Sequence, residues 1–534
     1  MAKKIVRSDE RKSIMGLDVN GPVFFTSSII IIISIALTLI FEEQAEEAFT
    51  AIQNVVANNG GWFFVLCVNI YLIFVLYLAF SKFGNIRIGG KDAKPEFKTI
   101  SWFAMLFSAG MGIGLLFWSI AEPVTHFMNP PLTEGGTPEA AQEAMNFTFL
   151  HWGFHAWGIY ALVGLSLAYF TYSHGLPLTI RSVFYPVLGD KIYGKRGDLI
   201  DIFAVLATLF GLATSLGLGV QQIAAGLAHV FGLDSGIVTQ VSLIAGITAI
   251  ATISVVLGVD KGVKFLSEWN MRIAVLLLLL VVILGPTIFI FQSFVQNTGN
   301  YFYSFLEISS WTESYTGNDW QNAWTVFYWG WWIAWSPFVG MFIARISKGR
   351  SIREFILGVL IVPSLITFFW ISAFGSTSIQ QALLGDQTII NAVDDNVATA
   401  LFVFLEDFPF SAVLNIIGVI LIAGFFVTSS DSGSLVVDSL TSGGKIDAPV
   451  GQRIFWAMAE GAVAAVLLIG GGLQALQTAS IVTGLPFAFI LLFMCYSLYN
   501  GVRDEYLKAE EKKAQKELCL LYTSPSPRDR TRSR

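Results

Sequence analysis

Long runs of residues without any charge dominate this chain. An α-helix needs roughly 20 such apolar residues to cross the hydrocarbon core of a bilayer. Only 13% of the residues are charged and the mean hydropathy is +0.65, which also favours a membrane protein. With two spans placed in 454–502, we count about twelve, so the sequence predicts an all-α polytopic membrane protein. The other uncharged runs are 20–41, 48–81, 99–121, 144–180, 202–233, 235–259, 273–306, 320–344, 355–385 and 408–430.

The basic residues sort to one side of the predicted membrane. If twelve spans alternate in direction, all 32 Lys and Arg residues fall on the N-terminal side. The loops of the other side carry only acids, such as Glu42, Glu134 and Asp394. Because loops rich in Lys and Arg stay in the cytoplasm, both termini are expected to be cytoplasmic. The first apolar run is too long for a signal peptide and lacks a small-residue cleavage site, so we expect a retained span.

Two spans contain residues that disturb a helix near the middle of the bilayer. The third span holds the glycine-rich segment "SAGMGIG" (108–114), and the eighth holds Pro337 within "WGWWIAWSPF". Irregular backbone at this depth is tolerated only where it is buried in protein or lines a watery cavity. The two segments are five spans apart, which puts them in opposite orientations. This placement predicts two inverted repeats whose broken helices meet at a substrate site.

Aromatic residues cluster at the same depth in two spans. The eighth span has four tryptophans within seven residues, and the fourth span contains "HWGFHAWGIY". A single tryptophan there would be explained by gap filling between helices or by an interfacial belt. Two clustered aromatic faces instead favour a binding site between them, which we call the aromatic box. On regular helices its members share one face in each span. They are Trp331, Trp332 and Trp335 of the eighth span and Trp152, Trp157 and Tyr160 of the fourth.

The chemistry of the aromatic box points to a quaternary ammonium group. An anionic guest would need an arginine and a metal ion would need His, Asp or Glu, and the box contains none of these. His151 and His155 flank it and are expected to be hydrogen-bonded packing residues. A quaternary ammonium has no N–H donors and is held by cation–π attraction, worth about 2 kcal/mol or more when desolvated. If the guest also has a carboxylate, the opened backbone at 110–114 can supply N–H groups.

Three segments of the chain resemble the betaine/carnitine/choline transporter family, secondary transporters of trimethylammonium compounds. They are "AGMGIGLLFWSIAEP" (109–123), "HWGFHAWGIY" (151–160) and "WTVFYWGWWIAWSPFVGMFIARISKGRSIREF" (324–355), the last being the signature region of the family. The resemblance extends from the first span to about Arg503. It implies a LeuT-like fold of ten core helices, a homotrimer, and a location in the plasma membrane, the inner membrane of a prokaryote.

The resemblance also divides the chain. It implies a cytoplasmic N-terminus at 1–19, two peripheral transmembrane helices at 20–98, a first five-helix repeat at 99–306, a second at 307–502 and a cytoplasmic tail at 503–517. The composition changes abruptly at 518–534, "LCLLYTSPSPRDRTRSR", and we expect this end not to be native.

The resemblance further implies which residues hold the substrate. The six residues of the aromatic box would form a cage around the ammonium group. Gly110, Gly112 and Gly114 of the glycine run and Ser215 of "FGLATSLGLG" would lie beside it. Gly114 matches the betaine-type members, because choline-type members tend to carry an acid there.

Betaine carriers of this family use sodium as the coupling ion, and the resemblance implies one sodium site here. Hard oxygen ligands suit a small hard cation. The alternative for the two hydroxyls of this site is ordinary bonding to their own helix backbone. The implied ligands are the hydroxyls of Thr428 and Ser429 and backbone carbonyls near Ser108, Met111 and Phe425.

A second sodium site is matched only in part. Thr208 occupies one of two threonine positions of the fifth span, but Leu212 occupies the other and supplies no oxygen. The sodium stoichiometry therefore stays open. No cationic side chain stands near Thr428 in the sequence, which argues against a sodium-independent exchanger.

These features predict sodium-coupled import of glycine betaine or a related zwitterion such as dimethylsulfoniopropionate. The alternatives are proton-coupled choline uptake, with Asp431 and Glu460 as titratable candidates, and carnitine-type exchange. A channel would need a polar pore ring, and an enzyme would need a convergent catalytic set. The five histidines and the membrane acids show no metal-ligand spacing, and the three cysteines form no paired metal motif. No cofactor other than the sodium ion is expected. The expected partners are the trimethylammonium substrate and membrane lipid, with no nucleic acid.

Overall fold

The structure, a computed structural model, describes residues 17–110, 112–256, 262–317, 319–445 and 449–523. Within these ranges the chain forms helices and one isolated β-bridge between Arg87 and Ser351, which confirms the all-α prediction. Ten helices are long and apolar enough to span a membrane, and a bent helix pair makes an eleventh. The aromatic helix α13 (Thr325–Ile346) has 22 residues, or about 33 Å, and is by length alone also sufficient to cross a bilayer.

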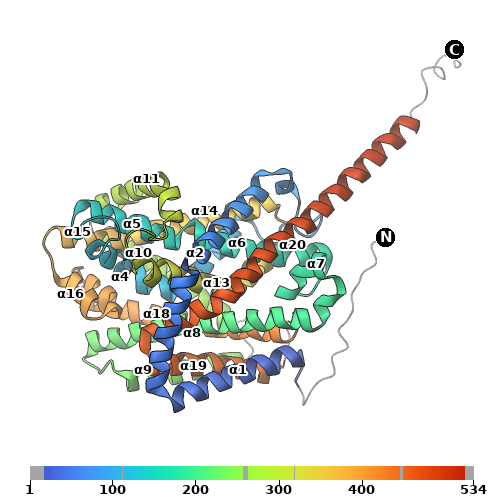
Figure 1. Ribbon diagram of the computed structural model, residues 1–534. Coiled ribbons are helices and arrows are strands. Elements are labelled where there is room, and N and C mark those ends of the chain that lie inside the picture. Colours follow the sequence, from blue (N-terminus) through green and yellow to red (C-terminus); the bar gives the residue numbers. More distant parts are fainter. Residues whose placement is uncertain (1–16, 111, 257–261, 318, 446–448, 524–534) are drawn as a thin grey trace.

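The first half of the chain forms the elements that run from the blue to the yellow-green part of the ribbon (Figure 1). They are α1 (Gly21–Ile40), α2 (Glu42–Phe80), η1 (Lys82–Asn85), α3 (Thr99–Gly110), α4 (Ile113–Met128), α5 (Pro138–Trp152), α6 (Phe154–Ala168), η2 (Tyr169–Ser173), η3 (Ile180–Phe184), α7 (Tyr185–Leu188), η4 (Gly189–Tyr193), α8 (Lys195–Phe231), α9 (Ile237–Val256), α10 (Gly262–Leu284) and α11 (Thr287–Ser310).

The second half begins with the aromatic helix and ends in the long α20, which runs out of the bundle toward the C-terminus (Figure 1). Its elements are α12 (Trp320–Ala323), α13 (Thr325–Ile346), α14 (Ile352–Ile371), η5 (Ser372–Ser376), α15 (Thr377–Leu383), α16 (Thr388–Asp395), η6 (Val397–Thr399), α17 (Ala400–Glu406), α18 (Ser411–Thr441), α19 (Val450–Ile469) and α20 (Gly472–Thr523).

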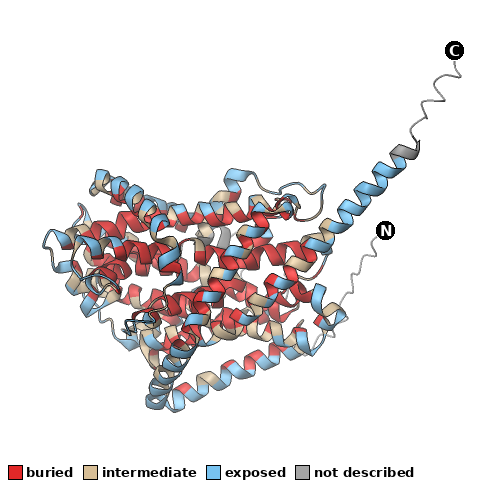
Figure 2. Ribbon diagram, turned by 45° about the horizontal axis from the view of Figure 1, so that its top comes forward, coloured by how far each residue is buried: buried red, intermediate tan, exposed pale blue. Residues whose placement is uncertain are grey.

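Helix α13 lies in the centre of the bundle. It packs against α6, α8 and α20, and α8 in turn packs against α18. Buried residues fill this centre, whereas the outward faces of the peripheral helices are exposed (Figure 2). On α1, for example, Ile29, Ile32 and Ile33 are all exposed. Such apolar outer faces are what a helix in contact with lipid requires.

Glycines allow the backbones around α13 to approach closely. A Cβ atom on Gly484 of α20 would lie 2.6 Å from the carbonyl oxygen of Gly330. On the other side, a Cβ atom on Gly340 would lie 2.6 Å from Val163 and 3.1 Å from the backbone nitrogen of Gly164. Small residues at helix contacts are how membrane helices gain van der Waals packing without a hydrophobic driving force.

The prediction of a helix break at Pro337 is wrong, because α13 continues through this residue. Proline lacks the N–H that would bond to the carbonyl four residues earlier, which here belongs to Ile333. The hydroxyl of Ser336 donates to that carbonyl instead, at 2.7 Å. Only the first of the two predicted breaks is present: α3 and α4 meet at an angle of 65° around the glycine run.

The fourth span is broken where the sequence predicted one regular helix. Helix α5 ends at Trp152 and α6 begins at Phe154, with Gly153 between them at φ −99° and ψ −139°. A side chain on Gly153 would meet the carbonyl oxygen of Phe149 at 2.5 Å and the ring of Phe368 at 2.8 Å. Trp152 therefore belongs to a different helix from the other two aromatic residues of this face.

The uncharged run 273–306 is also not a single span. Helix α10 ends at Leu284, and Gly285 and Pro286 separate it from α11. Because proline cannot donate to the preceding turn, the chain changes direction at this point. The length of an uncharged run therefore overstated the length of the helix.

The segments expected to be cytoplasmic lie against one another. The backbone N–H of Ile88 donates to the carbonyl of Arg350 at 2.9 Å, and Arg87 donates to the carbonyl of Gly349 at 2.7 Å. Lys445 binds Asp18 at 2.6 Å, which joins the N-terminal segment to the loop after α18. These contacts join two pairs of segments that were expected on the same side of the membrane.

We predict that Gly484→Leu destabilises the bundle by separating α20 from α13. Overpacking of this kind costs about 1–3 kcal/mol. The unfolding temperature of the purified protein in detergent measures the effect. The matched control is Gly246→Leu in α9, where an added Cβ atom meets nothing within 4 Å. Equal unfolding temperatures for the two variants would contradict the close contact between α13 and α20.

Candidate functional site

All six residues of the aromatic box line one cavity in the middle of the bundle, as the sequence predicted. Its volume is about 30 Å³, which is room for about two water molecules. Gly112, Gly114 and Ser215 line the same cavity, as does Ser429, which was predicted as a sodium ligand. The lining residues that the sequence analysis missed are Ile113, Leu115, Ala156 and Thr367.

Two rings of the box are stacked, and others stand nearly perpendicular to them. Trp331 and Trp332 stack with centroids 4.6 Å apart and an angle of 13° between their planes. Trp152 stands edge-on to Trp332 at 5.0 Å, so α5 closes the box against α13. Tyr160 of α6 lies 6.2 Å from Trp332 and 6.5 Å from Trp335. The rings thus face the cavity from three helices rather than the two that were expected.

Gly114 brings the start of α4 into direct contact with the box. A Cβ atom at this position would lie 2.4 Å from Cη2 of Trp331 and 3.3 Å from Cη2 of Trp152. No side chain fits there while the rings keep these positions. Gly110 is the last residue of α3, and Gly112 is the extended residue that precedes α4.

The first turn of α4 offers backbone donors at the cavity. The first intrahelical bond runs from the N–H of Leu116 to the carbonyl of Gly112. The N–H groups of Ile113, Gly114 and Leu115 precede this bond and therefore have no acceptor within the helix. All three residues line the cavity. This is the arrangement that the sequence predicted for a carboxylate, although Met111 lies outside the described residues.

A buried carboxylate behind the box was missed by the sequence analysis. Glu122 of α4 is fully buried. Trp152 donates its indole N–H to Oε2 of Glu122 at 2.8 Å, and the hydroxyl of Tyr328 donates to the same oxygen. Nδ1 of His151 lies 2.7 Å from Oε1, and Nε2 of His126 lies 3.3 Å from it. The signal was an acid directly after the third uncharged run, which was interpreted as the end of the span.

The expectation that no histidine has metal-ligand spacing was incomplete. Glu122 and His126 are four residues apart on α4, and one ligand atom from each lies within 4.8 Å of one from His151 of α5. These three groups could hold a metal ion by geometry. The expectation covered the membrane acids as well as the histidines, and spacing along the chain did not show that His151 of α5 lies beside Glu122 and His126 of α4.

The flanking histidines are hydrogen-bonded packing residues, as expected. His151 reaches Thr325 with Nε2 at 3.0 Å, and its backbone carbonyl accepts from the indole N–H of Trp332 at 2.8 Å. His155 lies with Nε2 3.3 Å from Oδ1 of Asn69. His151 thereby connects Glu122 to a second ring of the box.

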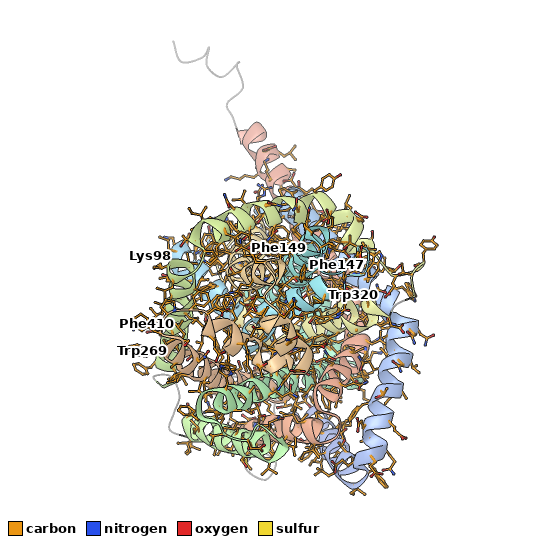
Figure 3. The ribbon with its side chains drawn as sticks, turned by 90° about the vertical axis from the view of Figure 1, so that its left-hand side faces the viewer. Lys98, Phe147, Phe149, Trp269, Trp320 and Phe410 are labelled. Atoms are coloured by element: carbon orange, nitrogen blue, oxygen red, sulfur yellow. The ribbon has the colours of Figure 1, made fainter. Side chains whose placement is uncertain are left out.

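Further aromatic side chains cover the network around Glu122. Phe147 and Trp320, both labelled in Figure 3, have ring centroids 4.7 Å apart. The ring of His126 lies 4.7 Å from Trp320. Water is thereby kept from the carboxylate, because these side chains are buried.

Two of the hydroxyl groups predicted for the sodium sites, those of Thr428 and Thr208, bond to their own helices. Thr428 donates to the carbonyl of Gly424 at 3.0 Å or of Phe425 at 3.2 Å, and Thr208 donates to Ala204 at 2.7 Å. This is the alternative that the sequence left open. Ser108 lies near the end of α3, whereas Met111 is not described. The sodium ligands therefore stay a prediction.

The comparisons with known proteins decide the family. The model of the betaine/carnitine/choline family transporter matches residues 22–507. The chain belongs to this family. It is therefore a transporter and not an enzyme.

Characterised relatives are similar along nearly the whole transporter. A glycine betaine/proline/choline/ectoine transporter of Vibrio parahaemolyticus is 48% identical, with 92% of this chain and 88% of that protein covered. Glycine betaine transporter 1 of the same organism is 49% identical, with 92% and 95% covered. A glycine betaine transporter of Acinetobacter baylyi is 46% identical, with 92% and 75% covered.

We predict that Gly114→Ala disturbs the box of this transporter, because the new methyl group would force the ring of Trp331 to move. The near-ultraviolet circular dichroism of the stacked pair Trp331 and Trp332 should change. The unfolding free energy should fall by about 1–3 kcal/mol. Gly112→Ala is the control, since nothing lies within 4 Å of a Cβ atom there. Identical spectra for both variants would argue against this packing.

Proposed function

We propose that the protein imports glycine betaine, or a related quaternary ammonium or sulfonium zwitterion, by sodium-coupled transport around the aromatic box. The observation that carries this proposal is that two aromatic faces and the start of α4 line one buried cavity. No Lys, Arg, Asp or Glu is among the residues that line it. The names of the relatives, which are transporters of betaine-type solutes, support the same substrate class.

Each of the two charged groups of a betaine has suitable residues in the cavity. The ammonium group, which cannot donate hydrogen bonds, would lie against the stacked and edge-on rings. The carboxylate would accept from the free N–H groups at the start of α4, where the helix dipole also favours negative charge. Among the described residues, Nε1 of Trp331, Nε1 of Trp335 and the hydroxyl of Tyr160 have no partner and are further donors.

The small volume of the cavity implies movement during transport. A trimethylammonium group is larger than the two water molecules for which about 30 Å³ provides room. The rings of α5, α6 and α13 must therefore separate to admit it. Opening the box toward one side of the membrane and then the other is alternating access around a fixed midplane site.

We predict that Trp332→Leu abolishes most betaine uptake into proteoliposomes. Loss of one cation–π contact of about 2 kcal/mol weakens binding about 30-fold. The control is Trp62→Leu, because Trp62 on α2 is exposed and far along the chain from the box. Full uptake by the Trp332 variant would refute the ammonium site. Trp335→Leu is expected to behave like Trp332→Leu.

The proposed sodium site places the coupling ion next to the substrate. Ser429 lines the cavity, and Thr428 precedes it on α18. With sodium bound, the Thr428 hydroxyl would direct a lone pair to the ion while its hydrogen remains on its own helix. Carbonyls near Ser108, Met111 and Phe425 would complete an oxygen shell. Thr208 remains a candidate for a second, weaker site.

We predict that betaine uptake requires an inward sodium gradient. Thr428→Ala should raise the sodium concentration for half-maximal uptake by about tenfold, which corresponds to about 1.4 kcal/mol. Thr483→Ala is a matched control, because Thr483 also donates to its own helix, at 2.7 Å to Ala479. Uptake that persists unchanged without sodium would contradict the coupling.

A proton-coupled choline carrier is the second candidate. Glu460 of α19 is fully buried, and its Oε1 has no hydrogen-bond partner in the part of the chain that the structure describes. Buried acids within a membrane often belong to proton routes. Choline currents driven by a pH jump in the absence of sodium would favour this function over sodium-coupled betaine import.

We further propose a homotrimer in the inner membrane with both termini in the cytoplasm. The distribution of Lys and Arg in the sequence supports this orientation, and the contacts between Ile88 and Arg350 and between Lys445 and Asp18 are consistent with it. The two five-helix repeats at 99–306 and 307–502 are part of the same proposal. The break between α3 and α4 supports the first repeat, while the continuous α13 offers no matching break in the second.

A further inference from the structure

The aromatic box has no charge on its inner surface, but it has one directly behind it. Glu122 does not line the cavity, but Trp152 does. The indole N–H of Trp152 donates to the carboxylate of Glu122 at 2.8 Å. One side chain of the box is therefore hydrogen-bonded directly to a buried carboxylate.

The surroundings of Glu122 stabilise a negative charge. The carboxylate is fully buried, and indole, hydroxyl and imidazole groups surround it on both oxygens. Hydrogen bonds to the charged form are what allow a carboxylate to remain ionised away from water. Among the described residues no Lys or Arg is paired with it; its neighbours there are the imidazole rings of His126 and His151, which carry a charge only when protonated.

The same carboxylate controls the rings of the box through two routes. It accepts directly from Trp152, and it contacts His151, whose carbonyl accepts from Trp332 at 2.8 Å. Tyr328, which also donates to it, lies with its ring 5.8 Å from that of Trp332. An indole whose N–H is bonded to an anion gains electron density on its π face. Its attraction for a cation then increases, because cation–π attraction depends on the negative face of the ring.

We propose that Glu122 determines the charge selectivity of the aromatic box. Its carboxylate raises the affinity for a cationic head group over a neutral one of the same shape, through the field at the cavity and through the polarised ring of Trp152. Glu122 is thus a specificity-determining residue that does not touch the substrate. This inference rests on the proposed function, because it assumes that the cavity binds the ammonium group.

The experiment compares two ligands of nearly the same shape. They are glycine betaine and tert-butylacetate, in which carbon replaces the positive nitrogen. Dissociation constants are measured by calorimetry on the full-length protein in detergent with sodium present. Glu122→Gln keeps the size of the side chain and removes its charge. We expect the preference for betaine over tert-butylacetate to fall about tenfold, whereas a purely structural role would weaken both ligands equally.

Three further variants make the test specific. Glu122→Asp retains the charge and should keep most of the preference. Trp152→Phe retains a ring but removes the N–H that joins it to the carboxylate, so it should lower the preference even if Glu122→Gln does not fold. Glu143→Gln is the matched control: Glu143 is a buried acid on α5 whose carboxylate accepts from the backbone of Leu132 at 2.8 Å, away from the box. It should leave the preference unchanged.

An unchanged preference in Glu122→Gln and in Trp152→Phe would overturn the role of Glu122. An equal loss of affinity for both ligands would overturn it as well. Failure of the proposed function has a different signature, because the unmodified protein would then show no preference for betaine over tert-butylacetate.

Discussion

A backbone inside a bilayer must satisfy its own hydrogen bonds, and this constraint decides where the chain can bind anything. Two of the interruptions of regular helix in the described chain, at Gly112 and at Gly153, adjoin the aromatic box. The first break releases three backbone N–H groups at the cavity. The second allows Trp152 to leave the line of α6 and close the box. At Pro337 the helix continues, and the hydroxyl of Ser336 donates to the carbonyl of Ile333, which the proline leaves without its usual N–H donor.

The box combines an apolar surface with polar support from behind. Its rings offer π faces and edges to the ammonium group, and three of them also carry a hydrogen-bond donor without a partner among the described residues. The indole nitrogens of Trp152 and Trp332 are bonded away from the cavity, to Glu122 and to the carbonyl of His151. Those two bonds hold the rings in place. The residues that hold these rings in position, and the carboxylate near them, thus lie outside the surface that the guest would touch.

Many residues of the site could be predicted from the sequence, and those that could not were missed for physical reasons. Helical spacing placed Trp331, Trp332 and Trp335 on one face, and the continuous α13 confirms it. The three aromatic residues of the fourth span line the cavity as well, but helical spacing did not predict the interruption at Gly153. That interruption depends on the close contact of Gly153 with Phe368, which is distant in the sequence. Glu122 escaped notice for the same reason: its partners come from three separate helices.

The sequence by itself determined the membrane setting, the all-α class and the identity of the aromatic residues, because each depends on composition or on local periodicity. Only the tertiary structure decided how large the cavity is, which ring lies edge-on, and that a buried carboxylate supports the box. Those properties arise from packing between helices far apart in the chain, where a change of one methyl group at Gly114 decides whether Trp331 fits.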